Sequence, residues 1–138
     1  MCSATRPKNL RARCRRAIAA VELAVCLPVL VLLMLGAIEC SNIIFLRQAL
    51  VQASYEAAKL ASRPDAQAAD VIARAEAVLT ARNVHGYSVT LTPANTTAAA
   101  RGSDVRATVT APIGVNTLVP YVQFSKQSMT VSMTAVKH

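Results

Sequence analysis

The residue that first suggests chemistry is Glu22, a carboxylic acid near the start of a long apolar run. From Ala17 to Ile38 the chain has 22 residues, and Glu22 is the single charged one. A charge inside a bilayer costs about 2.5 to 3.5 kcal/mol on insertion scales, so an acid at such a place tends to have a partner or a function. The residues around Glu22 are therefore the first place to look for a reaction that creates a partner.

A small residue at the end of a basic leader precedes this acid, and that pattern is typical of a processing site. Ala17 closes the leader, and Glu22 is the fifth residue after it. Cleavage between Ala17 and Ile18 would create an α-amine one helical turn from Glu22, and in an assembly this amine could pair with the carboxylate of a neighbouring subunit. The alternative is that Glu22, about 6 Å inside the helix start, reaches headgroup water and pairs with nothing.

The remaining polar residues give little support for catalysis or metal binding. His85 and His138 are not placed as a pair, and the carboxylates occur singly. The sequence has no nucleophile elbow, phosphate-binding loop or dinucleotide fingerprint. We therefore expect no enzyme activity, no cofactor, no metal and no small-molecule substrate.

The apolar run predicts one transmembrane helix over residues 18–38. As a helix, the run measures roughly 33 Å, which is enough for one bilayer crossing. Six basic residues and no acid precede it, and this bias predicts a cytoplasmic leader over residues 1–17 and an extracytoplasmic domain over residues 39–138. The residues around the end of the run make a poor signal-peptidase or lipoprotein site, so we expect the span to stay in the mature protein.

Most of the formal net charge of +8 comes from that leader. The rest of the chain has nine basic and seven acidic residues, and the whole chain has two Phe, three Tyr and no Trp. Nucleic-acid binding would need a basic stripe and stacking aromatic side chains. We exclude nucleic acid as a partner.

Two other residue types, in the span and just after it, have more than one interpretation. Pro28 removes a backbone donor and should bend or loosen the helix. It is either a flexible point for extraction into a filament or an ordinary tolerated membrane proline. We interpret Cys26 and Cys40 as packing residues rather than as an intersubunit bridge or modified thiols, and we expect no internal disulfide.

Beyond the membrane, the sequence predicts an α+β domain. Apolar residues at spacings of three and four continue the first helix through residues 39–62. A second amphipathic helix is expected over residues 65–85. From residue 87 to 138, apolar and polar residues alternate in segments, which predicts about three antiparallel strands. The two helices must cover the apolar face of this small sheet.

The ends of the second helix also have sequence signals. Asp65 follows a proline and is expected to be the N-cap, while Gly86 is expected to stop the helix. Asp70 and Arg74 are spaced to pair at i,i+4 on its surface.

The stretch from Arg15 to Ser62 contains a small residue followed by Ala-Val-Glu, a Leu-Pro within the span, a Gly and then Glu39 at its far end, and Arg47-Gln48-Ala49 followed by Glu56-Ala57-Ala58. With these features it resembles the TadE-like family, minor pilins of the tight-adherence (Flp) type IV pilus system. The family usually has Gly where this chain has Ala17 and an aromatic residue where it has Leu23.

The resemblance implies a pilin-like fold and a role in pilus assembly. A prepilin peptidase would cut between Ala17 and Ile18 on the cytoplasmic face of a bacterial inner membrane, and Glu22 would act in assembly. The partners would be other pilins and assembly platform proteins, and the chain would prime, cap or decorate a pilus. Two alternatives stay open: an uncleaved single-pass accessory protein of a secretion or envelope complex, and a membrane-anchored sensor or ligand-binding domain.

Overall fold

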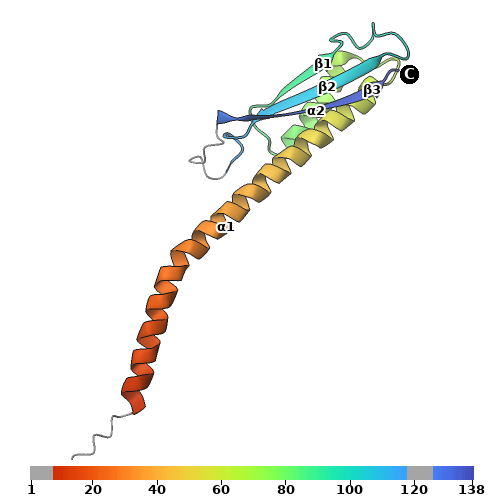
Figure 1. Ribbon diagram of the computed structural model, residues 1–138. Coiled ribbons are helices and arrows are strands. Elements are labelled where there is room, and N and C mark those ends of the chain that lie inside the picture. The colour runs from red at the N-terminus through yellow and green to blue at the C-terminus, as the bar shows by residue number, and fades with distance from the viewer. Residues whose placement is uncertain (1–7, 118–125) are drawn as a thin grey trace, which may run out of the picture. The chain divides into compact units, whose positions relative to one another are not determined.

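The computed structural model describes residues 8–117 and 126–138, with side chains from residue 18 onwards. The chain divides into two compact units, residues 1–38 and 39–138, and the first helix begins in one unit and ends in the other. The elements, in chain order, are α1 (Lys8–Ala61), α2 (Ala68–Ala81), β1 (Ser88–Thr92), β2 (Asp104–Pro112) and β3 (Ser128–Val136) (Figure 1).

The first unit contains the apolar part of α1. Every residue from Ile18 to Ile38 is exposed, although a helix that is apolar all round needs lipid or other protein around it. Within the described residues, α1 is the one helix long and apolar enough to cross a membrane, with a mean hydropathy of 2.7 in its most apolar window. The structure thus agrees with a single-pass membrane helix.

The core of the second unit is built on the predicted stripe of α1. Leu46, Leu50, Ala53 and Ala57 are buried, because residues three and four apart lie on the same side of a helix. From α2, the fully buried residues are Val71, Ala75 and Leu79.

The strands form one antiparallel sheet in the order β1-β2-β3. The register places Val109 of β2 between Val89 of β1 and Val131 of β3. The inward residues of the central strand are fully buried, whereas those of the two outer strands are only partly buried. Both helices lie on one face of the sheet (Figure 1), and this arrangement confirms the predicted α+β fold.

The N-terminal end of α2 differs from the prediction. The N-cap is Gln67, without a side-chain capping bond, and not Asp65. The cause is tertiary, because Ala66 is buried and its carbonyl accepts a hydrogen bond of 2.9 Å from the Thr96 hydroxyl. This bond holds the chain before Gln67 outside the helix.

The C-terminal end of α2 also differs, because the stop is Asn83 and not Gly86. Asn83 has a φ of 53°, the left-handed conformation that closes a Schellman motif. Its N–H donates to the Thr80 carbonyl at 3.0 Å, and the N–H of Val84 donates to the Leu79 carbonyl at 3.0 Å. Asparagine is the residue that tolerates this conformation best after glycine.

The end of β3 is bound to the end of α1. Lys137 is only 3% exposed, and its ammonium donates to the carbonyl of Arg63 at 2.7 Å and of Ala61 at 3.3 Å. The backbone N–H of His138 donates to the Ser62 carbonyl at 3.0 Å. These bonds satisfy carbonyls that the end of a helix leaves without partners.

Candidate functional site in the N-terminal helix

The residues predicted to carry the function all lie on α1. Ala17 and Ile18, the predicted cleavage pair, lie within the helix, and Ile18 is 55% exposed. Glu22 follows Ile18 by four residues and lies on the same side of the helix, one turn further on. Pro28 lies inside the helix. A backbone amine created at Ile18 would therefore be a near neighbour of the Glu22 carboxylate.

Glu22 is an exposed acid among exposed apolar side chains. Its neighbours Val21 and Leu23 are 63% and 60% exposed. In the part of the chain that the structure describes, no hydrogen bond or ion pair joins Glu22 to another residue. When this surface is covered by lipid or by other helices, the carboxylate loses water, and a positive partner offsets the cost of that desolvation.

Glu39 has the opposite environment. The sequence indicated only an acid at the end of the span, but Glu39 is 6% exposed in the second unit. Neither oxygen of its carboxylate has a hydrogen-bond partner among the described residues. Burial of a charge without a partner is costly. Among the described residues, no hydrogen-bond donor offsets that cost for the Glu39 carboxylate.

One residue that organises this end of the second unit was not predicted. The side-chain oxygen of Asn116 accepts from the His85 N–H at 2.8 Å, and its amide donates to the carbonyls of His85 and Pro112 at 2.9 and 2.8 Å. Asn42 of α1 donates to the Asn116 carbonyl. Asn116 thus joins α1, the turn after α2 and the end of β2. An asparagine in a loop with Pro and Gly has no sequence signal for such a role.

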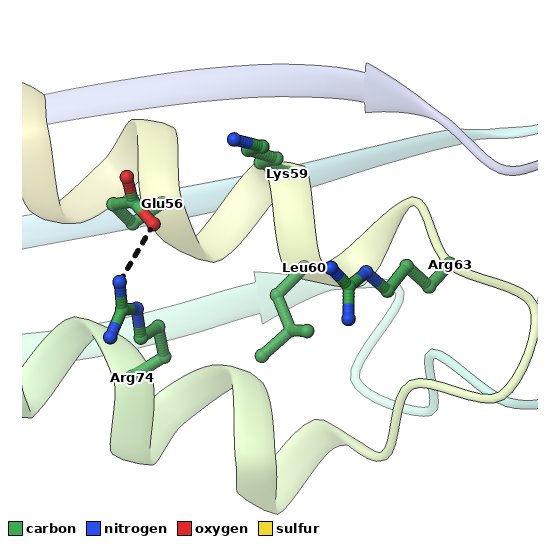
Figure 2. Close-up of a pocket in the computed structure, with 5 residues that line it drawn as sticks. All are labelled: Glu56, Lys59, Leu60, Arg63 and Arg74. Carbon is green, nitrogen blue, oxygen red and sulfur yellow. Dashed lines mark hydrogen bonds and ion pairs between the residues drawn. The ribbon is translucent and has the colours of Figure 1, made fainter.

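A cleft of about 320 Å³ lies between α1 and α2 (Figure 2). It is lined by Glu56, Lys59, Leu60 and Arg63 of the α1 side and by Arg74 of α2. Arg74 pairs with Glu56 at 3.2 Å, and not with Asp70 as the helical spacing predicted. With side-chain exposures of 55% and 28%, this pair contributes little to stability, because surface ion pairs are worth about 0 to 1 kcal/mol.

Among the described residues, the structure shows neither a metal-binding cluster nor a disulfide. No group of three or more His, Cys, Asp or Glu side chains is placed to hold a metal ion there. Cys26 and Cys40 are free and exposed.

The α+β domain and the long, exposed, apolar N-terminal helix agree with the class of single-pass membrane proteins. Residues 17–59 match the family described as TadE-like protein. The resemblance seen in the sequence is thus confirmed over this segment, and the segment is TadE-like. The match includes the predicted cleavage pair, Glu22, Pro28 and Glu39. No curated protein and no solved structure matched the chain.

Proposed function

We propose that the protein is a non-enzymatic minor pilin or pseudopilin that primes, caps or decorates a tight-adherence type pilus. The observation that carries this proposal is the TadE-like match over residues 17–59, on a helix whose exposed apolar stretch contains one acid, Glu22. Such a surface needs lipid before assembly and helical neighbours after it. Its partners are other pilins and the assembly platform.

Processing is the first step of the proposed function. The basic leader keeps the N-terminus in the cytoplasm, and a prepilin peptidase cuts between Ala17 and Ile18. The apolar helix then stays in the bacterial inner membrane, with residues 39–138 on the extracytoplasmic side. A reporter active only outside the cytoplasm should be active after His138 and silent near Arg16. The reverse result would contradict this orientation.

Assembly is the second step, and Glu22 is the residue to which we assign it. The amine of Ile18 in an incoming subunit pairs with the Glu22 carboxylate of a neighbour. Each group is costly to bury alone, and a close pair offsets much of that cost.

The mature N-terminus is the most direct test of processing. In cells with a prepilin peptidase, intact-mass measurement and N-terminal sequencing should find a chain that begins at Ile18. Replacement Ala17→Leu should leave the chain uncut, because the leucine side chain is too large for a subsite that accepts glycine, while Ala17→Gly should be cut. Recovery of only the uncut parent chain would favour an anchored accessory protein.

The variant Glu22→Ala tests assembly separately from processing. It should insert and be cut, because the span becomes more apolar and the leader is unchanged. Recovery of partner pilins in pulldowns and the number of pili per cell should both fall. Glu76→Ala, which removes an exposed acid of α2, is the matched control and should behave like the parent. Normal recovery and normal piliation in Glu22→Ala would refute the assembly role.

A further inference from the structure

The outer edge of β3 is a long strand edge that no described element covers. In the sheet order, β3 pairs with β2 on one side only. The backbone hydrogen bonds of Gln127 and Lys137 with the β2 side show that the N–H and C=O groups of odd-numbered β3 residues point toward β2. Successive residues of an antiparallel strand direct these backbone groups to opposite sides. The even-numbered residues from Ser128 to Val136 therefore direct their N–H and C=O groups outward.

The sequence of this edge lacks the features that usually protect an edge strand. Natural edges carry charges, proline, bulges or short strands that prevent pairing with another chain. β3 is nine residues long and reads SMTVSMTAV, without a charge, a proline or a glycine. The other edge strand, β1, is five residues long and is followed by Pro93. Of the two edge strands, β3 is therefore the longer and the less protected against pairing.

A groove lined by apolar and polar side chains lies beside this edge, between α1 and β3. Two adjoining hollows of about 370 and 390 Å³ share Arg47 and Val51 of α1. Met133 contributes to one hollow and Met129 to the other, and Tyr55 at the rim is 53% exposed. Methionine side chains adapt to differently shaped partners. The groove can thus accept the inward side chains of a strand added at the edge.

We propose that the free edge of β3 and this groove bind an extended segment of another polypeptide, which adds a fourth strand to the sheet. Backbone hydrogen bonds to the even-numbered residues of β3 hold the segment, and its alternate apolar side chains enter the groove. An acidic side chain of the segment fits Arg47, the one cation among the groove residues.

A second copy of this chain fits the edge less well. β3 begins beside Arg47 and Val51 and ends at Ala61, so β3 and α1 run in the same direction. Antiparallel pairing of two β3 edges would reverse α1 in the second copy. The two Glu39 ends would then lie at opposite ends of strands about 30 Å long, which is unsuitable for two chains anchored in one bilayer.

The test uses the full chain in lipid nanodiscs and a fluorescein-labelled peptide with the sequence of β2, Asp104–Pro112. This peptide has the required alternation, and β2 already pairs with β3 on its other side. Fluorescence anisotropy should show saturable binding. A control peptide with N-methyl groups at its Arg106, Thr108 and Thr110 positions should not bind, because methylation removes the donors and blocks the approach of the backbone.

Variants of the protein separate the edge from the groove. Ser132→Pro removes an outward N–H without removing a ladder bond to β2, and it should weaken binding about tenfold, or about 1.4 kcal/mol. Val51→Arg places a charge in the groove and should weaken binding at least as much. Ala73→Arg adds the same charge at an exposed site of α2 and should leave binding unchanged. Circular dichroism checks that each variant is folded.

Three results would overturn the proposal. One is no saturable binding of the peptide, and another is equal binding by the parent, Ser132→Pro and Val51→Arg. The third is an efficient disulfide between two copies through Ser132→Cys in a chain whose four native cysteines are replaced by serine, because a second copy would then occupy the edge. None of these results depends on cleavage at Ile18 or on Glu22, so a failure here is distinct from a failure of the proposed function.

Discussion

Lys137 should be one of the most important single polar residues for the stability of the second unit. Its ammonium is buried and donates to the carbonyls of Ala61 and Arg63, at the C-terminal end of α1. The replacement Lys137→Met keeps the length and most of the volume of the side chain but removes the charge and both donors. The cavity term should therefore be small, and the change reports mainly on the two hydrogen bonds.

The expected loss of stability in Lys137→Met follows from these two hydrogen bonds. A hydrogen bond to a charged group contributes about 1.5 to 3 kcal/mol, and the negative end of the α1 dipole adds to the attraction. The 2.7 Å bond to Arg63 is the stronger of the two, and the 3.3 Å bond to Ala61 is weak. We expect Lys137→Met to lower the free energy of unfolding by about 3 kcal/mol. For a domain of about 100 residues this corresponds to a decrease in Tm of about 12 to 24 °C.

The assay is urea and thermal unfolding of the full chain in detergent micelles, followed by tyrosine fluorescence, since the chain has three Tyr and no Trp. Lys126→Met is the matched control because Lys126 is exposed, and it should change stability by less than about 0.5 kcal/mol. A loss below about 0.5 kcal/mol in Lys137→Met, or equal losses in both variants, would refute the capping role.

Three further predictions concern the connections of the second unit, with urea unfolding as the measurement. Thr96→Val should cost about 1 to 3 kcal/mol, because it leaves the buried Ala66 carbonyl without its donor; no change would show that water replaces the hydroxyl. Asn83→Ala should cost about 1 to 2 kcal/mol, because alanine is strained at its φ of 53°. Gly86→Ala should lower the free energy of unfolding more than Gly102→Ala. Both glycines have positive φ, but a Cβ at Gly86 would lie 3.2 Å from the ring of the proline that ends β2, whereas a Cβ at Gly102 would meet nothing within 4 Å. Equal losses would exclude that contact as a cause.

The periodicity of the sequence predicted the elements and their buried faces. The stripe that includes Leu46, Leu50 and Ala53 was recognised because the apolar residues on one side of a helix recur every three or four positions in the sequence. The strands were recognised in the same way, through alternation around Val105 and Val109. These patterns are local, so they need no knowledge of which elements meet.

The residues around the predicted cleavage site were also found from local signals. Ala17, Ile18 and Glu22 form a short motif, and a single acid in an apolar run is conspicuous without any structure. Their roles in cleavage and pairing remain predictions, to be decided by the mature N-terminus and the Glu22→Ala variant.

The sequence by itself thus determined the apolar span, the charge bias around it, the α+β class and the faces that form the core, because all of these depend on neighbours along the chain. Tertiary structure alone decided which polar groups meet. Arg74 pairs with Glu56 rather than Asp70, and Lys137 reaches the end of α1. Glu39 is buried without a partner among the described residues. Such contacts join residues distant in sequence, and their energies depend on distances and burial that no local pattern encodes.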